Sequence, residues 1–224
     1  MTVTLHRRPD EVLTPDEWER MAQVPPAVAL DCIPGAWLAE GVRPLMPPGR
    51  QPRLFGRAVT AQVTAPDFGA VVQALDHCGP GDVLVIAAGG DPGTAMIGEV
   101  LSGHLRRRGV AGVVCDGAIR DVGTLAGWPD FAAFSRHVTP RGPTGAAYGA
   151  VFATVSFAGG RVSPGDLVFG DDDGLVIVPP LAARDGLAAA EAKLALESRW
   201  IAALEGGAAV QQVFGLSAPE PAAD

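Results

Sequence analysis

Three residues in the middle of the chain could carry out chemistry together: Glu99, Arg120 and Asp121, with twenty residues between the glutamate and the arginine. An arginine can hold a carboxylate or carbonyl through its rigid fork of donors, and an aspartate can ligate a hard divalent cation. Taken alone, Arg120 and Asp121 could equally form an ion pair at a strand end, and Glu99 could simply complement a helix dipole. The candidate site therefore depends on the elements that position these residues.

The sequence around the three residues predicts a strand–loop–helix–strand unit. Residues 82–87 are rich in β-branched side chains and follow Pro-Gly, which indicates a strand. A glycine-rich loop over 88–97 leads into a helix that reaches about Arg108 and is stopped by Gly109. The apolar run 112–116 is typical of the next strand, so the two strands should be parallel with a right-handed crossover.

This crossover should bring both ends of the unit to one pocket. The helix runs away from its N-terminus, and the following strand runs back to nearly the same level. We therefore expect residues 117–121 to lie beside the loop 89–98 at the carboxyl edge of a sheet. Ligands bind at that edge in open α/β folds. Free backbone N–H groups from Gly98 to Leu101 would add an anion site at the helix N-terminus. Asp91 and Asp116 map to the same edge or its walls, and we interpret Asp116 as structural.

Several other chemistries are disfavoured by the residues present. The only lysine, Lys193, falls in an Ala/Leu/Glu helix pattern where we expect it to face solvent, whereas a Schiff-base enzyme needs a desolvated lysine. The loop 89–93 lacks both the P-loop lysine and the G-x-G-x-x-G spacing of dinucleotide sites. The four histidines are scattered without ligand spacing. Carboxylates remain, and their oxygens suit Mg²⁺ or Mn²⁺ better than zinc.

Composition predicts a globular, soluble and cytoplasmic protein. The 224 residues are 48% hydrophobic and 19% charged, which is ordinary for one domain with a proper core. A net charge of −8 argues against nucleic-acid binding. No apolar segment indicates a signal peptide or a membrane span. The three cysteines, Cys32, Cys78 and Cys115, indicate reduced thiols, with Cys115 buried in a strand.

The rest of the chain predicts an α/β fold with a C-terminal helix. Thr14-Pro15-Asp16-Glu17 is typical of a helix start with a capping box. The further expected elements are a strand over 55–63, a helix over 68–78, a three-strand meander over 151–157, 166–169 and 174–178 with Asp171–Asp173 in a turn, and a helix over 181–204. Gly206-Gly207 should end that helix, and the tail from Ser217 should be mobile.

The sequence also resembles a known family. Gly98-Glu99-Val100-Leu101, followed by the acid–twenty residues–Arg-Asp spacing that closes on Gly117–Asp121, is similar to the class II pyruvate aldolases that cleave 4-hydroxy-4-methyl-2-oxoglutarate. That family is related to RraA, the protein regulator of ribonuclease E. Residues 139–143 and 164–174 also resemble family segments, and the likeness covers roughly residues 25–205. Val100 and Ser102 stand where the family more often has leucine and alanine, which leaves the backbone donors unchanged.

The resemblance implies a particular architecture. The fold would be a single layered RraA-like α/β domain of the swivelling β/β/α type, with an N-terminal helical segment over 1–24, the aldolase domain over 25–205 and a C-terminal tail over 206–224. Such domains would assemble as homotrimers or homohexamers with the site at a subunit interface.

The resemblance also implies roles for individual residues. The backbone amides of Gly98, Glu99, Val100 and Leu101 and the guanidinium of Arg120 would bind the carboxylate and keto oxygen of a pyruvyl group. Asp121 would ligate Mg²⁺ or Mn²⁺, and Glu99 would hold a metal-bound water or transfer a proton. An acid from the C-terminal region of a neighbouring subunit would complete the site, with Glu197 as the candidate and Glu191 behind it.

Two main functions follow from the resemblance. One is metal-dependent retro-aldol cleavage of a 4-hydroxy-2-oxo acid to pyruvate, with oxaloacetate decarboxylation through the same enolate. The other is a non-catalytic RraA-type regulator that binds ribonuclease E; that branch lacks the metal-binding aspartate after its arginine, whereas this chain has Asp121. A methyltransferase, the third alternative, is disfavoured by the poor glycine fingerprint.

Overall fold

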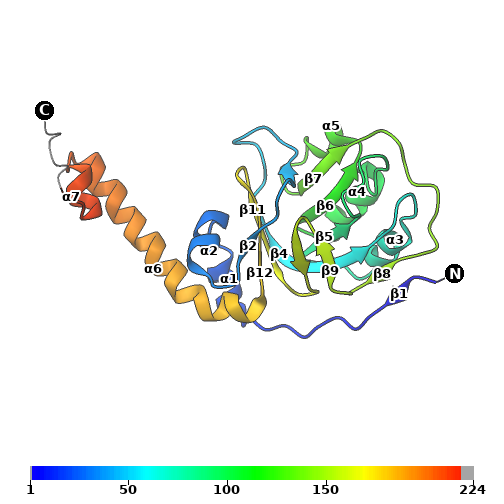
Figure 1. Ribbon diagram of the computed structural model, residues 1–224, viewed down its shortest axis with the longest axis horizontal. Helices are drawn as coiled ribbons and strands as arrows, with labels where there is room; N and C mark the ends of the chain where they lie inside the picture. The colour runs from blue at the N-terminus through cyan, green and yellow to red at the C-terminus, as the bar shows by residue number, and fades with distance from the viewer. Residues whose placement is uncertain (1, 218–224) are drawn as a thin grey trace, which may run out of the picture.

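The computed structural model describes residues 2–217, so residues 218–224 of the expected mobile tail lie outside the described part. Its largest element is a ten-stranded sheet with the order β2-β12-β11-β4-β5-β6-β7-β3, to which β1 and β8 are attached off this path (Figure 1). The strands are β1 (Thr4–Leu5), β2 (Trp37–Leu38), β3 (Arg43–Pro44), β4 (Leu54–Gln62), β5 (Asp82–Ala87), β6 (Gly112–Ile119), β7 (Ala132–Val138), β8 (Ala150–Val151), β9 (Val155–Phe157), β10 (Gly160–Val162), β11 (Leu167–Asp171) and β12 (Gly174–Val178). The helices are α1 (Pro15–Met21), α2 (Pro26–Cys32), α3 (Gly69–Leu75), α4 (Glu99–Arg107), α5 (Val122–Leu125), α6 (Pro180–Glu205) and α7 (Val210–Phe214).

Four neighbouring strands, β4 to β7, run parallel and form the part of the sheet that positions the candidate site. Every residue of β5 and of β6 is buried, which is typical of parallel strands covered on both faces. The predicted strand–loop–helix–strand unit is confirmed as β5, α4 and β6. The last strand continues to Ile119, beyond the predicted end at residue 116, because Ala118 and Ile119 keep pairing with β7 after an irregularity in the register.

The two faces of the parallel strands belong to different hydrophobic clusters. On one face, Leu84 and Ile86 of β5 pack in a cluster with Val71 of α3 and Leu105 of α4. On the other face, Val83 and Val85 share a cluster with side chains of the β9–β10 hairpin and of β11 and β12, among them Phe157, Val162 and Ile177. The mixed sheet is therefore curled around its own core, with α3, α4 and α5 outside it (Figure 1).

A third cluster fixes α1, α2 and the first part of α6 to the antiparallel strands β11 and β12. Met21 of α1 and Ala29 of α2 pack with Phe169 of β11 and Val178 of β12, and Leu187 of α6 joins them. The buried residues of α6 all lie in its first half, up to Ala190; the distal part projects away from the sheet and carries α7 at its far end (Figure 1). Helix α7 lies within the segment interpreted from sequence as a tail.

Two local predictions had different outcomes. The capping box is confirmed, because the Thr14 hydroxyl accepts from Glu17 N and the Glu17 carboxylate accepts from Thr14 N at 2.8 Å. The three-strand meander is wrong in part. Strands β11 and β12 form the expected hairpin, but β9 pairs with β10 in a separate two-stranded sheet. Gly159-Gly160 allows the chain to reverse immediately after β9 and form a tight hairpin. The strand pattern in the sequence did not distinguish this hairpin from a longer connection to the next strand. In the described part, no helix is long and apolar enough to cross a membrane.

Asp166, in the loop before β11, should make stability depend on pH. Its carboxylate is 7% exposed and accepts from Ser163 N at 2.7 Å. Burial raises its pKa from 3.8 to about 6, despite the opposing effect of the Ser163 hydrogen bond. An acid with a raised folded-state pKa contributes its full stability below the unfolded pKa and loses it as the pH rises through the folded pKa.

We therefore expect Asp166→Asn, which keeps the acceptor oxygen, to raise the free energy of unfolding at pH 8 by up to about 3 kcal/mol. Near pH 4 the gain should be much smaller, because the native carboxyl is already neutral there. Urea unfolding at both pH values measures the difference. An equal gain at pH 4 and pH 8 would contradict this assignment.

Candidate active site

Both ends of the β5–α4–β6 unit meet at the carboxyl edge of the parallel strands. Met96 N, in the loop before α4, donates to Ala118 O at 2.9 Å, and Arg120 N donates to Ile97 O at 3.0 Å. The loop therefore runs alongside the end of β6, and Arg120 and Asp121 follow that strand directly. The prediction that residues 117–121 lie beside the loop 89–98 is confirmed.

The carboxylate of Asp121 reaches the tip of α4. Glu99 N donates to Asp121 Oδ2 at 3.0 Å, and Arg120 Nε lies 3.5 Å from the same oxygen. Gly98 is the N-cap residue of α4 and has no side chain with which to cap it. Asp121 thus caps a helix that belongs to another part of the chain, while Val100 and Leu101 contribute first-turn N–H groups without intrahelical acceptors.

Asp121 has an unusual backbone conformation. Its φ of 57° and ψ of 33° lie in the left-handed region, at the N-cap of α5. Aspartate tolerates this region better than most residues, but the conformation is still uncommon outside glycine. Such strained positions are concentrated at functional sites, where the surrounding structure holds them.

Two glycines allow the backbone to approach Arg120 and Asp121 closely. A Cβ atom on Gly98 would collide with Asp121 Oδ2 and lie 2.7 Å from Arg120 Cγ. A Cβ atom on Gly142 would lie 2.6 Å from Arg120 Nη1. The arginine side chain is therefore held between two stretches of backbone that have no side chain at the point of contact.

A threonine from α5 orients the candidate acid. Thr124 Oγ1 donates to Glu99 Oε2 at 3.3 Å, so the Glu99 carboxylate is tied to α5, three residues after Asp121. Thr124 was not identified from the sequence. Its contact with Glu99 requires the first turn of α5 to lie beside α4, and no sequence signal indicates that arrangement.

The site has an apolar wall next to its charged groups. A small pocket of about 40 Å³ is lined by Phe68, Val100, Leu101 and Pro143 together with Arg120. Val100 is 75% exposed, so its side chain faces solvent beside this pocket. The arrangement provides a guanidinium, a helix tip and a carboxylate around a small concave surface with an apolar side.

Two other acids of the predicted edge support the loop and do not join this group. Asp116 is 3% exposed and accepts from Ala88 N at 2.6 Å, and burial raises the pKa of its carboxyl. Asp91 accepts from Thr94 N at 2.8 Å in a local turn. Their bonds to the loop between β5 and α4 are consistent with the structural interpretation of Asp116.

The C-terminal acids lie on α6, away from α4 within one chain (Figure 1). Glu191 Oε2 lies 2.7 Å from Arg20 Nη2 of α1, and this hydrogen bond holds the pKa of the glutamate below its usual range. Glu197 Oε1 lies 3.5 Å from Lys193 Nζ, which also stands over the ring of Trp200 at 5.1 Å. Lys193 is thus only 28% exposed and not simply directed to solvent. The assignment of Glu197 to a neighbouring subunit's site stays a prediction.

The residues at the helix tip fit a hard divalent cation. The Asp121 side chain is 39% exposed, and the hydrogen bond from Glu99 N engages only its Oδ2 atom. Within residues 2–217, no group of three or more His, Cys, Asp or Glu side chains could hold a metal. Structural and catalytic zinc sites use three or four protein ligands. Magnesium keeps several waters and binds through one or two carboxylates, which matches a single accessible aspartate.

Comparisons with known proteins identify relatives of this chain. A relative from Halalkalibacterium halodurans, named "Putative 4-hydroxy-4-methyl-2-oxoglutarate aldolase", is 34% identical over 157 residues, which are 70% of this chain and 73% of that protein. The crystal structure of Streptomyces coelicolor RraAS2, described as an unusual member of the RNase ES inhibitor RraA protein family, has a TM-score of 0.70 at 28% identity and covers 84% of this chain and 97% of its own.

A second solved structure shows the same fold. An uncharacterized protein from Pseudomonas syringae pv. tomato has a TM-score of 0.74 at 23% identity and covers 91% of this chain and 99% of its own. The sequence model of the family described as RraA-like (Aldolase/RraA) matches residues 31–177, which is more than half of the chain and includes Glu99, Arg120 and Asp121. The chain therefore belongs to the RraA-like family.

Proposed function

We propose that this protein is a divalent-metal-dependent (class II) aldolase that cleaves 4-hydroxy-4-methyl-2-oxoglutarate or a related 4-hydroxy-2-oxo acid to pyruvate. The single observation that carries the proposal is the meeting of Arg120, Asp121 and the tip of α4 at one edge of the sheet. The names of the relatives support the same activity. Asp121 would hold Mg²⁺ or Mn²⁺.

The chain's own groups would bind the pyruvyl part of the substrate. The N–H groups of Val100 and Leu101 at the positive end of α4 would hold its carboxylate. The guanidinium of Arg120, fixed between Gly98 and Gly142, would contact both the keto oxygen and that carboxylate. When bound, the metal would supply Lewis-acid polarisation of that carbonyl.

Cleavage would then need only a proton transfer and a stabilised charge. A base takes the proton of the 4-hydroxyl group, the C3–C4 bond breaks, and C4 leaves as a carbonyl. The electron pair of the broken bond remains on the pyruvyl fragment, with its negative charge on the keto oxygen beside Arg120, until C3 takes up a proton. Glu99, held by Thr124, would move protons at the helix tip. Oxaloacetate decarboxylation develops the same charge, so the same site should catalyse it.

The site would be completed in a homotrimer or homohexamer. In this proposal Glu197 comes from a neighbouring subunit, because α6 places it away from the α4 tip of its own chain. The distal part of α6 and α7 expose large apolar side chains, which supports contact with another copy; they include Ile201 (57% exposed), Val210 (54%) and Phe214 (44%).

The competing function is a non-catalytic regulator that binds ribonuclease E. A solved relative is described as an RNase ES inhibitor family member, so the fold alone does not decide between the two. A carboxylate directly after the arginine, placed on the helix tip in a strained conformation, favours catalysis. A regulator would have no need of it.

Steady-state pyruvate release from a panel of 4-hydroxy-2-oxo acids and oxaloacetate tests the proposal. We expect turnover with Mg²⁺ or Mn²⁺, no turnover with EDTA, and restoration when metal is added back. A pull-down against ribonuclease E from the same preparation should be negative. Pyruvate release that survives EDTA, or ribonuclease capture without any pyruvate release, would contradict the aldolase.

Gly98→Ala should impair the site by steric conflict alone. The glycine has extended backbone that any residue adopts, but its added Cβ would displace Arg120 and the Asp121 carboxylate. We expect kcat/KM to fall by about 10²-fold, as for loss of one preorganised donor. Gly123→Ala is the matched control, because a Cβ there meets nothing within 4 Å. Equal activity of the two variants in the pyruvate assay would show that the close approach is unimportant.

A further inference from the structure

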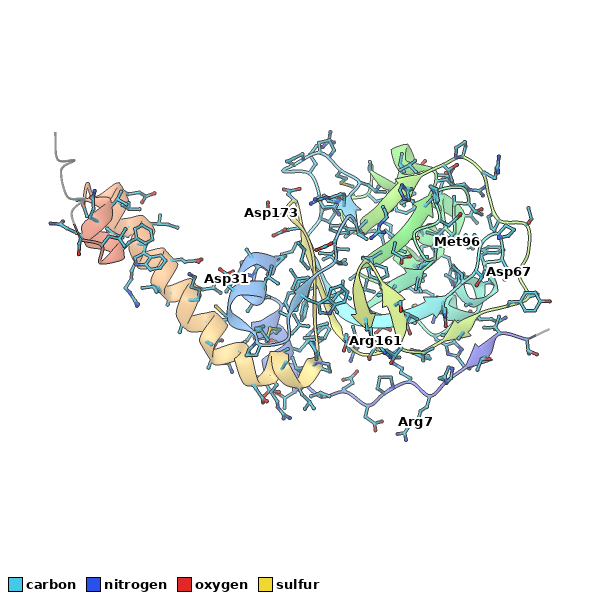
Figure 2. All side chains as sticks on the ribbon, viewed as in Figure 1. Arg7, Asp31, Asp67, Met96, Arg161 and Asp173 are labelled. Atoms are coloured by element: carbon cyan, nitrogen blue, oxygen red, sulfur yellow. The ribbon has the colours of Figure 1, made fainter. Side chains whose placement is uncertain are left out.

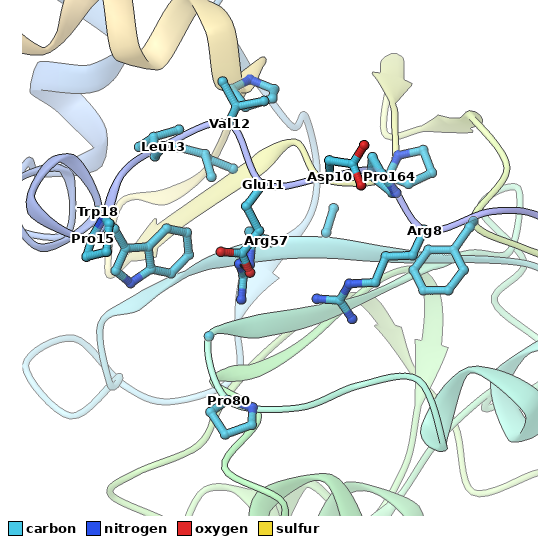
Figure 3. A pocket seen from close by; sticks show the side chains of 17 residues that line it. Arg8, Asp10, Glu11, Val12, Leu13, Pro15, Trp18, Arg57, Pro80 and Pro164 are labelled. Carbon is cyan, nitrogen blue, oxygen red and sulfur yellow. Dashed lines mark hydrogen bonds and ion pairs between the residues drawn. The ribbon is translucent and has the colours of Figure 1, made fainter.

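A second cavity lies at the opposite edge of the parallel strands from Arg120 and Asp121. It has a volume of about 420 Å³ and lies beneath residues 8–15 of the N-terminal segment (Figure 3). Its floor is formed near the amino ends of β4 and β5, at Arg57 and Gly81. The volume is within the range of small-molecule sites. We refer to it as the N-terminal cavity.

Apolar side chains form much of the wall of the N-terminal cavity. Trp18, Leu13, Leu167 and Phe152 line it, together with five prolines. The Trp18 ring also stacks near Phe55, with the ring centroids 4.5 Å apart, so its plane is held by the core of the protein. A fixed indole face of this kind suits a flat apolar ligand body, because little ordering of the Trp18 side chain is needed on binding.

One of its two arginines is fully engaged by a buried acid. Arg8 donates to both oxygens of Asp82, from Nη2 at 2.6 Å and from Nη1 at 3.0 Å. The Asp82 side chain is 2% exposed and also accepts from Gly79 N at 2.9 Å. The Arg8–Asp82 pair is therefore neutral, and it ties the N-terminal segment to the sheet.

The other arginine, Arg57, is poorly satisfied. Its buried Nε atom has no hydrogen-bond partner within the described residues, and Asp82 Oδ1 lies 3.6 Å away, beyond hydrogen-bond distance. Its guanidinium lies 5.0 Å from the ring centroid of Trp18. Its side-chain acid partner at the cavity is Glu11, which forms an ion pair with Nη1 although its own side chain is 67% exposed. The Arg57 side chain is 22% exposed, and a cation with a buried, unused Nε donor beside a largely apolar cavity suits an anionic ligand.

Glu11 is on a segment that could release it. No backbone–backbone hydrogen bond involves residues 7–13, which are described throughout, so side-chain pairs such as Arg8–Asp82 and Glu11–Arg57 hold this segment. Figure 3 shows the Glu11 carboxylate over Arg57, between Trp18 and Arg8. A carboxylate from the chain itself therefore occupies the place where a ligand's acid group would contact the guanidinium.

We propose that the N-terminal cavity binds a small organic anion with a flat apolar body, whose acid group replaces Glu11 on Arg57. The body of the ligand lies against Trp18 and the prolines, and Glu11 moves into solvent. This site is separate from the aldolase site and does not depend on its assignment.

Isothermal titration calorimetry with 2-naphthoate tests this proposal on the full chain. We expect saturable binding at one site per chain, with neutral 2-naphthamide and acetate both much weaker. Glu11→Gln should tighten 2-naphthoate binding about threefold, because an exposed ion pair no longer competes. Arg57→Gln should weaken it by tenfold or more, because a charge-assisted hydrogen bond is lost.

Asp31→Asn is the control for Glu11→Gln. It makes the same change of charge on α2, where Asp31 is exposed and does not line the N-terminal cavity (Figure 2). Its affinity for 2-naphthoate should equal that of the wild type. The proposal is overturned if neither the wild type nor Glu11→Gln binds saturably, if Asp31→Asn tightens binding as much as Glu11→Gln, or if pyruvate with Mg²⁺ displaces the naphthoate. The Glu11 comparison decides the matter even if Arg57→Gln does not fold.

Discussion

Asp121→Asn should reduce metal-dependent pyruvate release by about 10³-fold in kcat/KM, at the upper end of the cost of losing one preorganised electrostatic contact. Asparagine tolerates the left-handed backbone at this position and keeps an oxygen to accept from Glu99 N. The variant therefore preserves the cap of α4 and removes only the charge that would hold the cation. A magnesium titration of the pyruvate assay measures the effect.

The chain supplies a matched control for this change. Asp130 also pairs with an arginine, with its Oδ1 atom 2.6 Å from Arg106 Nε, but on the surface after α5. Asp130→Asn should leave kcat/KM within about twofold of the wild type, as expected for an exposed ion pair remote from the site. Retention of more than a tenth of the activity in Asp121→Asn, with unchanged circular dichroism, would remove the metal from the mechanism.

Arg120→Lys is expected to lower kcat/KM by about 10²-fold or more, although it keeps the positive charge. A lysine has no planar fork and cannot contact a keto oxygen and a carboxylate together. Its flexible stem would also not be fixed between Gly98 and Gly142, which contact the arginine at present. Initial rates in the pyruvate assay over a range of substrate concentrations separate the effects on kcat and KM.

The corresponding control is Arg106→Lys, at the opposite end of α4. Arg106 contacts Asp130 and the ring of Trp128, 5.2 Å from its centroid, and neither group is near the site. We expect this variant to turn over at the wild-type rate. If Arg120→Lys were as active as Arg106→Lys, a point charge would suffice and the proposed bidentate contact would be wrong.

The parallel unit was predictable because its signals are local. The β-branched run of β5, the glycine loop and the stop at Gly109 each depend on a few neighbouring residues, and the handedness rule for parallel crossovers then places Arg120 beside α4. The capping box at Thr14 was predictable for the same reason. By contrast, the pairing of β9 with β10 depends on which strand lies nearest in space, and a pattern of alternating residues does not contain that information.

The candidate site was predictable in its residues but not in its fine geometry. The acid–twenty residues–Arg-Asp spacing identified Glu99, Arg120 and Asp121. No sequence signal indicated that Asp121 would adopt a positive φ or that its carboxylate would cap α4 through Glu99 N. Thr124 was missed because its contact with Glu99 arises only after α5 packs beside α4. The N-terminal cavity was missed because its lining comes from segments far apart in the chain, from Arg8 to Pro180.

Exchange of the methyl protons of pyruvate for deuterium, followed by proton NMR in D₂O, tests the central claim most directly. It isolates the step in which negative charge develops on the keto oxygen between Arg120, Asp121 and the tip of α4, without any need to know the full substrate. We predict that the Mg²⁺-loaded wild type accelerates exchange, and that EDTA, Asp121→Asn or Arg120→Lys removes the acceleration. Exchange at the uncatalysed rate in the metal-loaded wild type, or acceleration that persists in Asp121→Asn, would contradict the account.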